Sequence, residues 1–215
     1  MKQYLISKNI PESKIFATGI PISSRFLKNY NKKEILDEFN LEENKKTILF
    51  FAGGEFGLGK NKTLQIFEDL IKNFEDIQVV AIAGKNEKMK LHFESIVKEF
   101  NKEKNVKVLE YTNKVPELMA ISDLVISKPG GLTTSESLAS NLPMIIINPI
   151  PGQEEENAEF LESKGTGVWI RRNDQPYEIL KNIINNSEKL EEMKKNTTTL
   201  SKKHSTENIC NTILK

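Results

Sequence analysis

Short apolar runs alternate regularly with longer amphipathic segments along this chain, and this alternation is the feature that most constrains its fold. The apolar runs lie at residues 47–52, 77–83, 106–109, 124–127 and 144–148, and residues 168–170 are a candidate for one further strand. Helical spacing of apolar residues occurs between them, at 63–73, 88–101, 115–121, 133–139 and 154–164. Strands that alternate with helices predict an α/β fold, a Rossmann-like doubly wound parallel sheet. Residues 175–215 are polar and are expected to be largely helical.

Composition excludes several classes of protein. Lysine plus arginine number 31 and aspartate plus glutamate 30, so the formal net charge of +1 gives no basic excess for binding nucleic acid. The single Cys210 excludes an internal disulfide and a cysteine-rich metal cluster. No apolar run reaches the roughly 18 residues of a membrane span, and the first residues lack a signal peptide's apolar core. We expect a cytoplasmic protein with at most peripheral membrane contact, and we attribute its many asparagines and lysines to genome composition.

Two loops that follow predicted strands carry the most informative side chains. The first, KPGGLTTSE at 128–136, places two glycines and then three hydroxyl residues at a predicted helix start, where free N–H groups suit an anion. The second, PIPGQEEENAEF at 149–160, offers Gln153 and Glu154, which are suited to binding hydroxyl groups. Because such loops meet at one edge of an open α/β sheet, the pair suggests a site for a nucleotide sugar.

A third loop, GGEFGLGK at 53–60, is rich in glycine. Glycines at 53, 54, 57 and 59 permit positive φ and a close approach of backbone N–H groups to phosphate oxygens. The spacing is neither that of a Walker A sequence nor that of the G-x-G-x-x-G fingerprint. The loop is therefore either a phosphate-binding loop or a tight turn between a strand and a helix.

Other residues allow two interpretations each. Glu136, predicted in the first turn of its helix, either complements the helix macrodipole, worth about 0.3–1 kcal/mol, or accepts the two hydroxyls of a ribose. The loop YTNKVP at 111–116 either binds a planar base through backbone groups of Thr112 or Val115 or simply closes the sheet. Arg25 is a candidate for a phosphate contact or an ordinary surface arginine. His92 and His204 are expected at solvated helix positions.

Taken together, GIPIS, GGEFGLG, YTNKVPELMAISD, KPGGLTTSE and PGQEEENAEF resemble the C-terminal, donor-binding half of GT-B glycosyltransferases. The resemblance runs from about residue 14 to residue 167. It is strongest to the monogalactosyldiacylglycerol synthases and the bacterial diacylglycerol glucosyltransferases. The peptidoglycan enzyme that adds N-acetylglucosamine to lipid I is a more distant relative. The segment KPGGLT…SE followed by PGQEE makes the similarity specific.

This resemblance implies a role for each loop. The diphosphate of UDP would lie against two glycine-containing loops, through Gly53, Gly54, Glu55, Phe56, Gly57, Gly130, Gly131, Leu132 and Thr133. Uracil would lie near Tyr111, Thr112 and Val115, the ribose at Glu136, and the transferred hexose at Gln153 and Glu154. The donor would be UDP-glucose or UDP-galactose, with no metal and no prosthetic group. Related enzymes often carry an arginine directly after the GIP turn, whereas Ser23 and Ser24 precede Arg25 here.

The resemblance also implies a domain organisation. Residues 1–13 would be the remnant of an N-terminal domain or linker, 14–200 the nucleotide-sugar-binding domain, and 201–215 a helix that crosses back to the N-terminal domain. That other domain would bind the acceptor, diacylglycerol or a similar lipid, and supply the catalytic base. The chain alone is then expected to be inactive, and the full enzyme peripheral on the cytoplasmic face of the membrane.

The sequence leaves other functions open. One is the transfer of N-acetylglucosamine to a peptidoglycan lipid; another is a non-catalytic UDP-sugar-binding module, or a subunit of a split enzyme whose partner chain supplies the acceptor domain. A UDP-sugar 2-epimerase shares this fold type but needs acid and base side chains across its cleft, and this sequence does not offer them.

Overall fold

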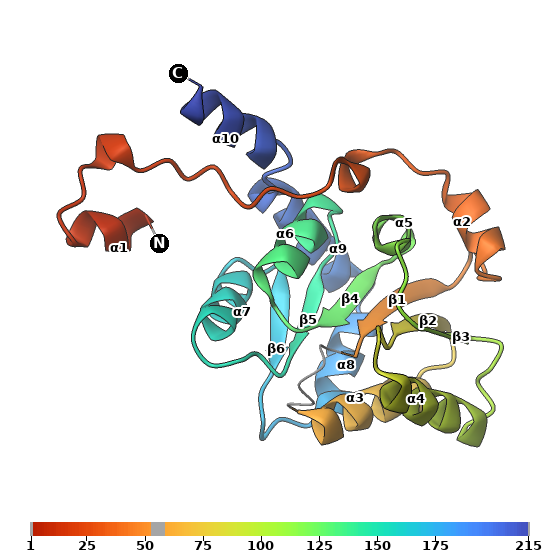
Figure 1. Ribbon diagram of the computed structural model, residues 1–215. Helices are drawn as coiled ribbons and strands as arrows, with labels where there is room; N and C mark the ends of the chain where they lie inside the picture. The colour runs from red at the N-terminus through yellow and green to blue at the C-terminus, as the bar shows by residue number, and fades with distance from the viewer. Residues whose placement is uncertain (1, 53–58, 215) are drawn as a thin grey trace.

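A six-stranded parallel sheet lies at the centre of the described part of the chain (Figure 1). The structure is a computed structural model that describes residues 2–52 and 59–214. The strand order is β3-β2-β1-β4-β5-β6. The strands are β1 (Lys46–Phe51), β2 (Ile77–Ile82), β3 (Val106–Leu109), β4 (Leu124–Ser127), β5 (Met144–Ile147) and β6 (Gly167–Ile170). This order confirms the predicted doubly wound fold and the sixth strand, and it reverses between β1 and β4, where open α/β sheets bind ligands.

Helices cover both faces of the sheet (Figure 1). One face packs against α3 (Lys60–Asn73), α4 (Glu87–Glu99), α8 (Pro176–Ile184) and the start of α9 (Ser187–Leu200). The other packs against α2 (Lys32–Glu38), α5 (Val115–Ile121), α6 (Gly131–Ala139) and α7 (Gln153–Ser163). Successive β1 side chains alternate between the two cores, Ile48 and Phe50 facing one and Leu49 the other. Burial on both faces explains why the strands read as continuous apolar runs.

The helix boundaries differ from the predicted ones in a consistent way. α3 begins at Lys60 and α6 at Gly131, each two or three residues earlier than expected. Both have a glycine N-cap, Gly59 or Gly130, which makes no side-chain hydrogen bond. Because a glycine cap leaves no Ser, Thr, Asp or Asn signal, the sequence pattern placed both starts too late. α2 was not predicted; Asn31 caps it by accepting a hydrogen bond from the Lys33 N–H.

Several helices end in the same way. Asn40, Asn101 and Asn141 follow α2, α4 and α6 and have φ between 50° and 54°, in the left-handed region. After α2, the N–H of Leu41 donates to the carbonyl of Leu36 at 2.8 Å, and equivalent bonds follow α4 and α6. This is the Schellman arrangement, which satisfies the last carbonyls of a helix. Asparagine here takes the position that glycine most often occupies.

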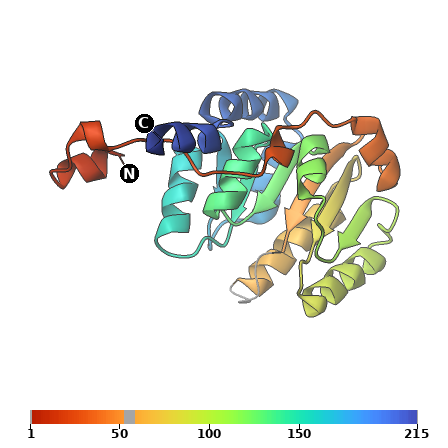
Figure 2. The same ribbon diagram turned by 45° about the horizontal axis from the view of Figure 1, so that its top comes forward.

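The segment that precedes the sheet contacts the start of the last helix. α1 (Lys2–Ser7) and the 3₁₀ helix η1 (Glu12–Lys14) lie apart from the sheet, at the end of an extended segment that passes α10 (Ser205–Ile213) (Figure 2). Lys202 Nζ donates to the carbonyl of Ala17 at 2.5 Å. Gly19 has φ +92°, and a Cβ there would lie 2.3 Å from Ser205 Oγ. Glycine is therefore required where the extended segment crosses the start of α10. In the ranges described, no helix is both long and apolar enough to cross a bilayer.

Candidate functional site

A cavity of about 300 Å³ opens at the carboxyl ends of β1, β2 and β4, at the point where the strand order reverses. Its walls are the strand ends, the loop after β4, the start of α6 and the first turn of α7, through Phe51, Ile82, Gly84, Ser127, Lys128, Gly130, Thr133 and Glu154. Three of the residues predicted to bind phosphate or sugar thus line one cavity. Its location is the one expected for a ligand site in this type of sheet.

The first turn of α6 offers backbone donors to this cavity. The first hydrogen bond within the helix joins the Thr134 N–H to the Gly130 carbonyl at 2.8 Å. Within residues 59–214, the N–H groups of Gly131, Leu132 and Thr133 have no hydrogen-bond partner, and no side chain caps the helix. These free donors and the positive end of the helix macrodipole favour an anion. Leu132 as a residue is 59% exposed and its side chain is apolar, so only its backbone suits the predicted role.

The two predicted loops meet beside this turn. A Cβ placed on Gly130 would lie 3.7 Å from Glu154 Oε1, and one placed on Gly131 would lie 3.7 Å from Gln153 Nε2. Gly130 has an ordinary φ of −60°, so its conformation does not require glycine. What glycine contributes here is the space left free by the missing side chain. Glu154 Oε2 accepts a hydrogen bond from the Ile150 N–H at 2.7 Å, which orients the carboxylate and fixes the loop before α7. The predicted phosphate and hexose residues are therefore neighbours.

Glu136 lies in the second turn of α6, and its prediction in the first turn was wrong because the helix begins at Gly131. This position removes the close macrodipole contact that the first turn would give. It follows Thr133 by three residues, which places it on the same face of the helix, one turn further in. Burial raises the pKa of Glu136, and among the described residues its carboxylate has neither a hydrogen-bond donor nor an ion-pair partner. A half-buried, unpaired carboxylate near a cavity is typical of a functional residue.

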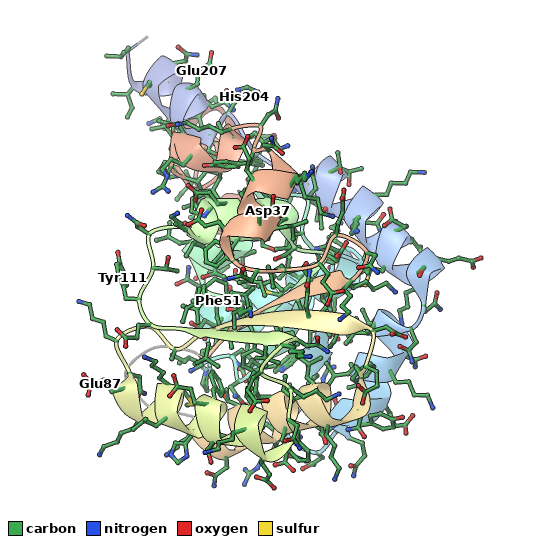
Figure 3. The ribbon with its side chains drawn as sticks, turned by 90° about the vertical axis from the view of Figure 1, so that its right-hand side faces the viewer. Asp37, Phe51, Glu87, Tyr111, His204 and Glu207 are labelled. Carbon is green, nitrogen blue, oxygen red and sulfur yellow. The ribbon has the colours of Figure 1, made fainter. Side chains whose placement is uncertain are left out.

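The predicted base-binding residues lie outside the cavity. Tyr111 stands on the loop after β3, at the left of Figure 3 and beyond Phe51, and its side chain is 71% exposed. Thr112 Oγ1 accepts a hydrogen bond from the Lys114 N–H at 3.1 Å. Val115 packs against the same core cluster as Phe51. A base near Thr112 and Val115 would therefore lie beside the cavity, on the far side of Phe51. The structure does not bring all the predicted site residues into one cavity.

Gly53, Gly54, Glu55, Phe56 and Gly57, predicted to bind diphosphate, lie outside the described residues. Gly59, which lies in the same loop, has a positive φ of +78°, a conformation that glycine permits. Asn148 Nδ2 donates to the Gly59 carbonyl at 3.2 Å and to Thr63 Oγ1 at 2.9 Å. The end of β5 is thus tied to the start of α3.

A second cavity, of about 710 Å³, lies between the start of α3 and the loop after β5. Lys60, Lys62 and Arg172 line it together with Glu155. The smaller cavity lies at the reversal of strand order and contains the predicted residues, so we take it as the candidate site.

Sequence reasoning assigned no role to Lys128. It is half-buried in the wall of the cavity, and among the described residues its ammonium group has no hydrogen-bonded or ionic partner. A cation beside free N–H groups strengthens an anion site. Its position directly after a buried strand was the signal that could have identified it.

The remaining candidates have other partners. Arg25 Nη2 contacts both carboxylate oxygens of Glu117, at 2.8 and 3.1 Å, so its side chain is engaged away from the cavity. His92 is exposed on α4, as predicted, and its Nε2 lies 2.9 Å from Nζ of Lys60 at the start of α3. His204 is exposed as the N-cap residue of α10. In the part of the chain that the structure describes, no three His, Cys, Asp or Glu side chains are grouped as metal ligands.

The fold and this site define a class of protein. It is a Rossmann-like domain in which the start of a helix that favours an anion lies beside side chains that can bind hydroxyl groups, at the point where the strand order reverses. Residues 48–211 match the sequence model of the glycosyltransferase family 28 C-terminal domain. The chain belongs to this family, which confirms the predicted resemblance to the C-terminal half of GT-B glycosyltransferases.

The curated relatives are longer than this chain. It is 38% identical over 213 residues to a processive diacylglycerol β-glucosyltransferase of Staphylococcus epidermidis, covering 99% of this chain and 53% of that enzyme. A Bacillus pumilus enzyme of the same name is 36% identical over 214 residues, covering 100% of this chain and 55% of its own length. The chain thus spans about half the length of these relatives.

Solved structures show the same fold. The UDP-GlcNAc 2-epimerase of Neisseria meningitidis, bound to UDP-GlcNAc, superposes with a TM-score of 0.74 at 20% identity, over 99% of this chain and 58% of that one. MurG of Acinetobacter baumannii superposes with a TM-score of 0.68 at 17% identity, over 84% and 52%. At such low identity these similarities establish the fold alone.

Proposed function

We propose that this chain is the donor-binding half of an enzyme that transfers a hexose from a UDP-sugar to diacylglycerol or a similar lipid. One observation carries the proposal: the start of α6, whose first N–H groups have no partner within residues 59–214, lines one cavity together with Lys128 and Glu154 at the reversal of strand order. The name and identity of the relatives support the choice of diacylglycerol over a peptidoglycan lipid. UDP-glucose and UDP-galactose are the donors that we propose.

Each group in the wall of the cavity or beside it has a proposed task. The N–H groups of Gly131, Leu132 and Thr133, together with Lys128, bind the diphosphate. Glu136 accepts the ribose hydroxyls, and Gln153 and Glu154 accept or donate hydrogen bonds to the hexose hydroxyls. Thr112 and Val115 border the uracil, with Tyr111 at its outer edge.

In the proposed reaction, an acceptor hydroxyl attacks the anomeric carbon as the bond to the β-phosphate oxygen breaks, with inversion. A base outside these 215 residues takes the hydroxyl proton. The negative charge that develops on the departing UDP is stabilised by donors already oriented toward it, which is the usual source of electrostatic catalysis. The enzyme would act as a peripheral protein at the cytoplasmic face of the membrane that holds its lipid acceptor.

Titration calorimetry with UDP, UMP and uridine tests the binding assignment. UDP should bind in preference to ADP, and Glu136→Ala should weaken both UDP and uridine by about 1.5–3 kcal/mol, the range for hydrogen bonds to a charged group. Glu156→Ala, on the exposed side of the first turn of α7, is the matched control and should leave both affinities unchanged. Unchanged affinity in Glu136→Ala would contradict the ribose assignment.

Incorporation of radiolabelled hexose into diacylglycerol tests the division of labour. The 215-residue chain should bind the donor without transferring sugar, and addition of an acceptor-binding domain should restore transfer. Robust transfer by the chain alone would show that the base lies among these residues.

A further inference from the structure

The start of α5 is held from two sides by elements that precede the sheet. Arg25, in the 3₁₀ helix η2 (Ser24–Leu27), pairs with Glu117 in the first turn of α5, and its Nη2 contacts both carboxylate oxygens, at 2.8 and 3.1 Å. Lys114, the N-cap residue of α5, pairs with Glu38, the last residue of α2. Both ion pairs lie at the α5 end of the loop that joins β3 to α5.

The backbone at Arg25 is itself fixed. The Tyr30 hydroxyl donates to the carbonyl of Arg25 at 2.9 Å, and Ser23 Oγ accepts from the Arg25 N–H at 3.3 Å. The side chains of Arg25 and Glu117 are 39% and 19% exposed. Partly exposed ion pairs contribute little to stability as a rule, so the geometry that this one imposes is of more interest than its energy.

The loop between β3 and α5 is short, so its conformation depends on the position of α5. Leu109 ends β3, the edge strand that pairs with β2, and Val115 begins α5 only six residues later. Thr112 Oγ1 accepts from the Lys114 N–H, so the loop's turn is continuous with the start of the helix. Since the strand is fixed by its neighbour in the sheet, a tilt of α5 would move Thr112 and Val115 together.

We propose that Arg25 and Glu117 are positioning residues for base recognition. Their ion pair holds α5 against η2 and so sets the orientation of the Thr112–Val115 edge that receives the base. The inference rests on the proposed function, because that function places a uracil at this edge. It gives Arg25 a role in positioning the base, whereas the sequence alone allowed a contact with phosphate or an ordinary surface position.

Uridine and UDP separate these two roles. A phosphate contact would affect UDP and leave uridine unchanged, since uridine has no phosphate. A positioning role acts on the part that both ligands share, so both should lose the same factor. Uridine is also uncharged. The dependence of its affinity on salt is therefore compared between the wild type and the single variants, because salt screens the exposed ion pair that these variants remove.

The experiment measures the dissociation constants of uridine and UDP for the 215-residue wild type, Arg25→Gln, Glu117→Gln and the swapped pair Arg25→Glu/Glu117→Arg. The single variants should weaken both ligands by the same factor, about 2- to 10-fold, as expected for residues coupled through a contact. The swapped pair should recover part of the loss. Wild-type affinity for uridine should fall with added salt, and this dependence should be reduced in the single variants.

Arg171→Gln is the matched control. Arg171 Nη2 pairs with Glu162 at 2.6 Å in a similarly exposed ion pair, but at the junction of α7 and β6. Its removal should leave both affinities unchanged. All affinities are compared at a temperature at which thermal melting shows every variant to be folded, so that a change in stability alone does not alter them.

Each outcome decides between the alternatives. Loss of UDP affinity with unchanged uridine affinity would overturn the inference in favour of a phosphate contact. Wild-type affinities for both ligands in the single variants would overturn it outright. If the wild-type chain bound neither ligand, the proposed function would fail and the inference with it, whereas the first two results leave the proposed function standing.

Discussion

Replacing Gly59 with alanine should destabilise the domain through Asn148. Gly59 is the N-cap of α3 and has φ +78°. A Cβ at this position would lie 2.4 Å from Cγ, 2.6 Å from Nδ2 and 2.7 Å from Oδ1 of Asn148. The Asn148 side chain would have to move, and its hydrogen bonds to the Gly59 carbonyl and to Thr63 Oγ1 would be lost.

The expected cost follows from these contacts. The left-handed conformation costs a residue with a Cβ about 1–2 kcal/mol. Two lost hydrogen bonds add about 0.5–1.5 kcal/mol each, so Gly59→Ala should lower the free energy of unfolding by about 2–5 kcal/mol. Gly84 has φ +65° and no atom within 4 Å of an added Cβ. Gly84→Ala should therefore cost only the conformational part, about 1–2 kcal/mol.

Chemical denaturation of a double-mutant cycle tests this reasoning. Asn148→Gly removes the side chain that would clash and tolerates the positive φ at position 148. In that background Gly59→Ala should cost about 1–2 kcal/mol, the same as Gly84→Ala. An equal cost for Gly59→Ala with and without Asn148 would refute the idea that this side chain fills the space above Gly59.

Three further predictions concern the site. Burial raises the pKa of Glu136 in the folded chain. Between the unfolded-state pKa and the folded-state pKa, the folded chain therefore keeps a proton that the unfolded chain has lost, and the free energy of unfolding falls as the pH rises through this range. Glu136→Gln should therefore unfold at higher denaturant concentration than the wild type at about pH 7, with the gain gone at about pH 3, where both states of the wild type are protonated. Lys128→Met should weaken UDP by about 1.5–3 kcal/mol in calorimetry while uridine affinity stays the same; equal losses would exclude a diphosphate contact. Gln153→Ala should weaken UDP-hexose and leave UDP unchanged, whereas Glu154→Ala should in addition lower the melting temperature because it releases the Ile150 N–H.

The fold could be predicted because its strands are buried on both faces. Residues such as Val80 and Ile126 are fully buried, and the runs that contain them stand out from the amphipathic helices between them. Helix starts were harder. Gly130 caps α6 without a side-chain bond, so the pattern placed the start at Thr133 and put Glu136 one turn too early.

That Gly130, Thr133 and Glu154 lie together was predictable, because each stands in the loop or helix start that follows β4 or β5, and all three line one cavity. Contacts between distant segments were not. Arg25 and Glu117 are 92 residues apart, and no local pattern indicates that they meet. The raised pKa of Glu136 likewise depends on burial by the folded chain, which the local sequence does not show.

The asparagines that end α2, α4 and α6 bear on how this family can drift in sequence. At positions 40, 101 and 141 the backbone accepts a side chain, so a change of genome composition could exchange Asn for Gly at small cost. Gly165 ends α7 in the same conformation, but a Cβ there would lie 2.8 Å from Asn196 Nδ2, which donates to the Gly165 carbonyl. Part of the chain's asparagine content therefore occupies helix ends at which the left-handed backbone leaves space for a Cβ. Relatives from genomes of other composition should vary between Asn and Gly at the first three positions and keep glycine at the fourth.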